Sequence, residues 1–74
     1  MPKISLKAAR INAGYTQEEF AAKLQVSKEA VIKWETGKTP IRFYHLAAYA
    51  VATGFSVDDF ILPVKSEENE QVGK

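Results

Sequence analysis

Cysteine is missing from this chain of 74 residues, so neither a disulfide bond nor a thiolate metal site can stabilise it. Long apolar runs are missing too, because no stretch approaches the roughly 20 residues that a membrane-spanning helix needs. A chain this short buries only about 60% of the surface that its unfolded form exposes. Its 46% of hydrophobic residues must therefore suffice, and we expect one small cytoplasmic domain.

A large net charge is also absent, since the formal total is only +1. The charges are nevertheless unevenly spread. Residues 1–54 carry eight Lys or Arg against four acids, or +4, whereas residues 55–74 carry two Lys against five acids, or −3. A basic excess on the first part of the chain favours a nucleic-acid partner, although solvated helix faces can produce similar imbalances.

Groupings typical of catalysis or metal binding are not recognisable. The single histidine, His45, has no Cys, second His or spaced carboxylate near it in the sequence, so we expect no metal site. The glycines form no phosphate-cradling loop, and the acids lie mostly at predicted helix starts and near the C-terminus. We therefore expect no enzyme, no cofactor and no small-molecule ligand.

Helix start and stop residues divide the chain into five predicted helices. The first runs from its N-cap Ser5 to about Asn12, the second begins at Gln17, the third spans Lys28 to about Glu35, the fourth spans about Arg42 to Thr53, and the fifth opens at Ser56. Thr16 to Glu19 matches a capping box. Apolar residues from Phe43 to Ala50 predict the core face of the fourth helix. We assign residues 1–65 to the folded domain and residues 66–74 to a disordered acidic tail.

The stretch from Gln17 to Thr36 fits two helices that cross steeply over a short turn, each with one narrow face to bury. The apolar positions in it fall at helical spacing: Phe20, Leu24, Val26, Val31 and Trp34. Ala21 is small where the two backbones come closest. Gln25 lies at the turn position that usually takes a left-handed conformation, which costs a non-glycine residue roughly 1 kcal/mol. The pattern is typical of a DNA-binding helix-turn-helix.

Three strings resemble the phage repressor and Cro type of helix-turn-helix regulators, the Xre family: GYTQEEFA (14–21), VSKEAVIKWETGK (26–38) and GFSVDDF (54–60). The resemblance extends from about Leu6 to Leu62. It implies an all-α, compact five-helix fold like that of lambda repressor, whose third helix enters the major groove of DNA. The function that it implies is a sequence-specific transcriptional regulator in a bacterium or a phage-infected host.

In such proteins the exposed N-terminal face of the third helix reads bases, which here comprises Lys28, Glu29, Ile32 and Lys33. Lysine donates to guanine O6 and N7, glutamate accepts from the cytosine amino group, and isoleucine packs on a thymine methyl. Alternatives stay open for each residue. The two lysines could contact phosphates or solvent, Glu29 and Lys33 could form an ion pair within the helix, and Ile32 could contact a protein partner.

The resemblance also implies phosphate contacts at the edges of the motif, from Gln17, Ser27, Thr36, Lys38, Thr39 and Arg42. Gln17 would be helped by the positive end of its own helix, and Ser27 also fits as the N-cap of the third helix. A further implication is a partly buried ion pair between Arg10 and Glu35. Removing one partner of a buried pair costs about 3–5 kcal/mol.

The last apolar cluster predicts a homodimer interface formed by Phe60, Ile61, Leu62 and Val64. These residues could alternatively close the core of a single chain. A dimer would place two recognition helices about 34 Å apart and read a palindromic operator in double-stranded DNA. The alternative function is a protein-interaction module, such as an antitoxin that masks a toxin through its C-terminal segment.

Overall fold

Four α-helices and one pair of short strands form the computed structural model, which describes residues 3–63. The elements, in chain order, are β1 (Ile4–Ser5), α1 (Leu6–Asn12), α2 (Gln17–Leu24), α3 (Lys28–Thr36), α4 (Phe43–Thr53), the single 3-10 turn η1 (Val57–Asp59) and β2 (Phe60–Ile61). Two sequence predictions, Val64 in a dimer interface and a disordered tail over 66–74, lie outside the described residues.

Helices α1, α2 and α3 begin at the residues that the capping pattern predicts, whereas α4 begins at Phe43, one residue after the predicted start, and has no side-chain cap. The hydroxyl oxygens of Ser5 and Ser27 each accept a hydrogen bond of 3.1 Å from the backbone N–H three residues further on. Thr16 and Glu19 form both bonds of a capping box, each 3.0 Å long. These contacts satisfy amide donors that have no partner inside the helix, so short helices of seven to nine residues are well defined at their starts.

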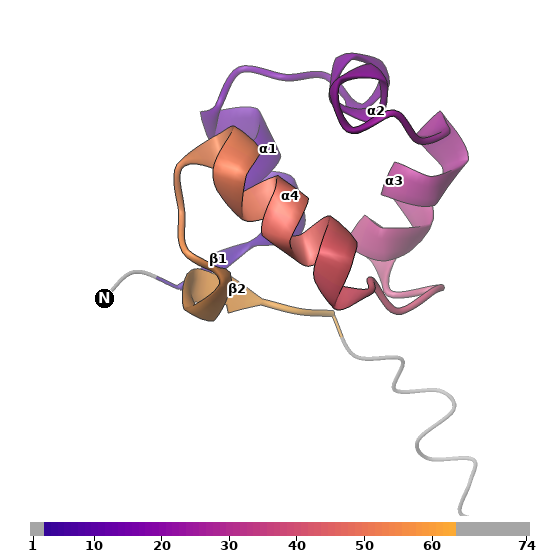
Figure 1. The fold of residues 1–74 in the computed structure, drawn as a ribbon. Helices are drawn as coiled ribbons and strands as arrows, with labels where there is room; N and C mark the ends of the chain where they lie inside the picture. The colour runs from indigo at the N-terminus through magenta and orange to yellow at the C-terminus, as the bar shows by residue number, and fades with distance from the viewer. Residues whose placement is uncertain (1–2, 64–74) are drawn as a thin grey trace, which may run out of the picture.

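The turn between α2 and α3 depends on Gln25, which adopts the left-handed conformation at φ 61° and ψ 44°, as the sequence predicts. The turn lets α3 cross α2, and Figure 1 shows α2 almost end-on above the descending α3. Phe20 and Val31 are fully buried at this crossing, and Ala21 is only 4% exposed. The small side chain of Ala21 fits a position where the two backbones approach closely.

Helix α4 crosses the middle of the molecule and packs against α1, α2 and η1 (Figure 1). Its Tyr49 is fully buried, and its ring lies edge-on to that of Phe20 with centroids 4.6 Å apart. The core of the described residues gathers apolar side chains from every helix: Leu6, Ala9, Phe20, Ala21, Val31, Trp34, Leu46, Tyr49, Ala50 and Phe60.

The predicted fifth α-helix is instead one turn of 3-10 helix followed by an extended segment. The backbone N–H of Ser56 donates to Asp59 Oδ2 at 3.0 Å, which closes the turn. Phe60 then places its ring in the core from extended backbone, and β2 pairs in parallel with β1, Ile4 opposite Phe60. The all-α, five-helix prediction therefore becomes a mostly helical fold with four α-helices among residues 3–63. None of these helices is long and apolar enough to cross a membrane.

Candidate nucleic-acid interface

The outer face of α3 carries the four predicted base-reading residues, opposite the side that buries Val31 and Trp34. Three of them, Lys28, Glu29 and Lys33, are exposed, whereas Ile32 is half-buried. Because the core fixes the opposite side of α3, this outer face is presented on a rigid support.

Charged side chains on this face form few ion pairs with other residues within 3–63. Lys28 Nζ lies 3.4 Å from Glu18 Oε2, and the two side chains are 47% and 74% exposed. An exposed pair of this kind contributes only about 0–1 kcal/mol, so a stronger ligand can displace it. No ion pair joins Glu29 to Lys33 in this part of the chain, which leaves the carboxylate and the ammonium group available to a partner.

Gln17 lies at the start of α2 on one flank of α3, half-buried. Its Nε2 donates to Glu35 Oε1 at 3.5 Å. A primary amide carries two N–H groups, so the contact orients the side chain and still leaves one donor. Gln17 is thus placed to offer an N–H beside the positive end of α2.

The loop between α3 and α4 forms the other flank. Lys38, Thr39 and Arg42 are all exposed there, and the backbone N–H of Thr39 donates to the Lys33 carbonyl at 3.2 Å, which holds the loop against the end of α3. Two basic side chains and one hydroxyl therefore lie beside the outer face of α3.

Two predicted phosphate ligands use their hydroxyl groups in hydrogen bonds within the fold, Thr36 as a donor and Ser27 as an acceptor. Thr36 Oγ1 donates to the Ile32 carbonyl at 2.9 Å, and phosphate oxygens accept hydrogen bonds but do not donate them. Thr36 can therefore bind a phosphate only by giving up that bond. The Ser27 oxygen is the acceptor in its cap, which leaves its O–H free to donate among the described contacts.

Beneath the interface, Arg10 and Glu35 form a bidentate ion pair that ties α1 to α3. Arg10 Nε and Nη2 lie 2.8 and 3.0 Å from the two carboxylate oxygens, and the side chains are only 6% and 2% exposed. Arg10 Nη1 also donates to the Tyr15 carbonyl at 2.9 Å. Such planar, two-bond geometry is the strong form of the Arg–carboxylate contact.

Tyr49 joins this network from α4, donating from its hydroxyl to Glu35 Oε2 at 3.0 Å. Burial, and secondarily the adjacent Glu35 carboxylate, raises the pKa of Tyr49 well above its usual value. The phenol therefore stays protonated and keeps its hydrogen bond at physiological pH. The helical spacing predicts a core position for Tyr49, but nothing in the spacing points to its polar partner.

The start of α4 departs from the predicted burial pattern. Phe43, expected on the core face, is 71% exposed, and its neighbour Tyr44 is 77% exposed. Both follow Arg42 at the edge of the basic loop, where these three residues and Thr39, Pro40 and Ile41 line a shallow hollow. Two exposed aromatic rings therefore lie beside the loop, which the sequence pattern does not indicate.

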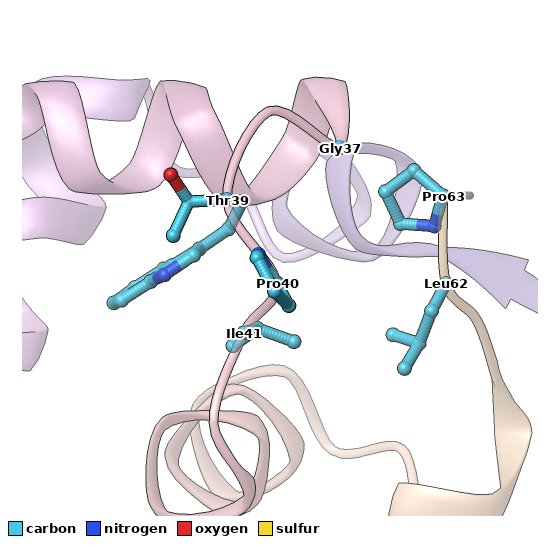
Figure 2. Close-up of a pocket in the computed structure, with 7 residues that line it drawn as sticks. Gly37, Thr39, Pro40, Ile41, Leu62 and Pro63 are labelled. Carbon is cyan, nitrogen blue, oxygen red and sulfur yellow. The ribbon is translucent and has the colours of Figure 1, made fainter. Parts of the chain in front are cut away.

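The predicted dimer cluster divides between core and surface. Phe60 is only 8% exposed and belongs to the core of the single chain, so its ring is not available to a partner. Ile61 and Leu62 are 53% and 42% exposed. Leu62 and Pro63 lie across a hollow from Gly37 and Pro40 (Figure 2). The hollow has a volume of about 80 Å³.

One comparison identifies a relationship to known proteins. A family model described as helix-turn-helix matches residues 6–60, from the first residue of α1 to the first residue of β2. No curated protein matches the chain. The matched region includes α2, the turn, α3 and the loop that follows, which together carry the interface described above.

Proposed function

The chain belongs to the Xre/Cro-like helix-turn-helix family of DNA-binding proteins, and from that premise we propose that it is a sequence-specific transcriptional regulator of the Cro or repressor type. The observation that carries the proposal is the outer face of α3. It presents Lys28, Glu29 and Lys33 to solvent on a helix whose other side is fixed in the core.

In the proposed complex, α3 lies in the major groove and these side chains contact base edges. Lys28 and Lys33 donate to guanine acceptors, Glu29 accepts from a cytosine amino group, and the exposed part of Ile32 packs on a thymine methyl. Each good contact contributes roughly 1–3 kcal/mol of discrimination against the wrong base.

Phosphates would be held on both sides of α3. Gln17 and the α2 N-terminus contact one strand, with Ser27 donating from its hydroxyl, and Lys38, Thr39 and Arg42 contact the backbone on the other flank. Thr36 contributes least, because its hydroxyl is engaged within α3. Phosphate contacts fix the register of the helix but carry no sequence information themselves.

We further propose that two chains bind a palindromic operator as a homodimer through Ile61 and Leu62. Both are exposed apolar residues next to the loop flank. A twofold arrangement would present the same patch from each chain and set the spacing of the two half-sites at about 34 Å.

The decisive experiment selects operators from a randomised duplex pool with the full chain and compares Lys33→Ala with Lys38→Ala. We expect a selected palindrome to bind at least ~10³-fold more tightly than random DNA. Lys33→Ala should relax the preference at one base position. Lys38→Ala should weaken all sequences alike and reduce the slope of log K against log salt by about 1.

One result of this experiment would reject operator recognition. If no sequence is enriched, and both lysine variants lower binding to random DNA equally, operator recognition through α3 is rejected. That outcome would favour the other function considered for this fold, a protein-interaction module such as an antitoxin. One observation supports that second candidate: Val51, 85% exposed, lines a hollow with Tyr15, Leu24 and Ala48.

A further inference from the structure

We propose that the acidic segment Glu67, Glu68 and Glu70 docks on the basic loop between α3 and α4 and competes there with DNA phosphates. The inference rests on the proposed function, because it assigns regulation to the same phosphate-binding residues. The occupant is part of this chain, and its identity follows from where the folded part ends, how far the next residues reach, and charge complementarity.

The folded part ends against the basic loop. After β2, Leu62 and Pro63 run to Gly37, the residue that caps the C-terminal end of α3. The approach is close: a Cβ placed on Gly37 would lie 3.1 Å from Pro63 Cβ. Figure 2 shows Pro63 directly beside Gly37. The described chain therefore ends at Pro63, beside the residue that precedes Lys38 at one edge of the proposed DNA-binding surface.

The glutamates are within reach of this loop. Glu67 is four residues beyond Pro63 and Glu70 is seven, which correspond to extended spans of roughly 13 and 24 Å. Lys38 directly follows Gly37 in the chain, and Arg42 ends the same loop as the N-cap of α4. These spans are long enough for the glutamates to reach Lys38 and Arg42 without crossing the molecule.

The charges on the two sides are complementary. Among residues 3–63, the ion pairs are Arg10–Glu35 and Lys28–Glu18, so Lys33, Lys38 and Arg42 have no carboxylate partner there. Two of these cations lie in the loop and Lys33 lies in the adjoining α3, and the sequence after Pro63 carries three glutamates of opposite charge. A tether this short gives an effective concentration in the millimolar range, which favours contacts that would be too weak between separate molecules.

Exposed ion pairs are individually weak and are screened by salt. The segment should therefore lower DNA affinity by roughly tenfold at low ionic strength and hardly at all at high salt. It should act most strongly against random DNA, which is bound through phosphates alone. The consequence is an improved ratio of operator binding to non-specific binding.

The first test measures DNA affinity of the full chain and of the triple variant Glu67→Gln, Glu68→Gln and Glu70→Gln across a salt series. We expect the variant to bind random duplex roughly tenfold more tightly at low salt, with a steeper salt dependence, and to converge with the parent at high salt. A matched pair separates docking from net charge: Glu68→Gln against Asp58→Asn, which removes one exposed acid from η1 instead of from the segment after Pro63.

A second measurement needs no DNA. Carbodiimide coupling, which joins a lysine ammonium to a carboxylate in contact with it, should link Lys38 to Glu67 or Glu68 within one chain, and added duplex DNA or high salt should abolish the product. Equal affinities of parent and triple variant at low salt, equal effects of Glu68→Gln and Asp58→Asn, or no coupling at Lys38 would each overturn the inference. If DNA selection fails while coupling occurs, the proposed function falls instead.

Discussion

Glu35 accepts hydrogen bonds from three other side chains, Arg10, Gln17 and Tyr49, and so connects all four α-helices at one carboxylate. Burying that charge is expensive unless every lone pair is used, and here the partners come from separate helices. The network therefore joins the stability of the fold to the position of Gln17, a proposed phosphate ligand.

Removing Arg10 alone should be costly. Arg10→Met leaves the Glu35 carboxylate buried without its cation, so we expect the free energy of unfolding to fall by about 3–5 kcal/mol. The matched control is Lys28→Met, which breaks the exposed pair with Glu18 and should cost no more than about 1 kcal/mol. Urea denaturation followed by the fluorescence of Trp34 measures both.

A double variant tests whether the loss of stability comes from the unpaired charge of Glu35. Arg10→Met combined with Glu35→Leu removes both charges and should recover much of the lost stability, since apolar groups of similar size often replace a buried pair without loss. Equal costs for Arg10→Met and Lys28→Met would contradict the assignment of a buried, stabilising pair.

At the scale of secondary structure, two helix-capping glycines provide a comparison of backbone strain with packing. Gly37 and Gly54 cap α3 and α4 with φ of 82° and 86°. A methyl group on Gly54 would meet open space, whereas on Gly37 it would meet Pro63 at 3.1 Å. The two positions therefore differ in packing while sharing the same left-handed conformation.

Gly54→Ala should lower the free energy of unfolding by roughly 1 kcal/mol, the cost of a left-handed non-glycine residue. Gly37→Ala should lose that amount and a further 1–3 kcal/mol, roughly, because Pro63 must move. Thermal unfolding of both variants gives the difference. Identical losses would mean that Pro63 moves away at no cost and that the segment beyond β2 is not held at the loop.

The α-helices could be predicted from the sequence because their signals are local. Caps at Ser5, Thr16 and Ser27 and stops at Gly37 and Gly54 each act within one turn of the chain. The strand pair could not be predicted, because two-residue strands show no alternation and their partners lie at opposite ends of the described chain. The sequence from Val57 to Ile61 is compatible with a helix as well as a strand, because apolar residues so close together satisfy either period.

The candidate interface can also be predicted only in part from the sequence. Helical spacing separates the outer face of α3 from Val31 and Trp34, and the structure places Lys28, Glu29 and Lys33 on that exposed face. Spacing cannot say whether the first residue of a helix points into the core, so it does not predict the exposure of Phe43. Hydrogen-bond partners such as Tyr49 for Glu35 depend on how helices cross, which a single sequence does not encode locally.

For the whole molecule, the proposed dimer makes a prediction at Leu62. Leu62→Ser should leave the fold and the binding of a single half-site unchanged, because the side chain is 42% exposed. Binding to a complete palindrome should weaken by about 2 kcal/mol, since the twofold axis removes the apolar contact from both chains. Titration of half-site and full-site duplexes distinguishes the two effects.

Val51→Ser is the matched control, because Val51 is an exposed apolar residue on α4 and is 85% exposed. It should change neither titration. Equal behaviour of the two variants on the complete palindrome would place the dimer contact elsewhere or show that chains bind independently.

The parallel pairing of β1 with β2 also determines how the protein responds to mechanical load. The two strands join the beginning and the end of the described chain, with Ile4 opposite Phe60 and Ser5 opposite Ile61. Tension applied at the two ends would pull these parallel strands in opposite directions along their length, so their hydrogen bonds would be loaded in shear. The four helices lie between the two strands in sequence, so they would carry no tension until the strand pair had separated.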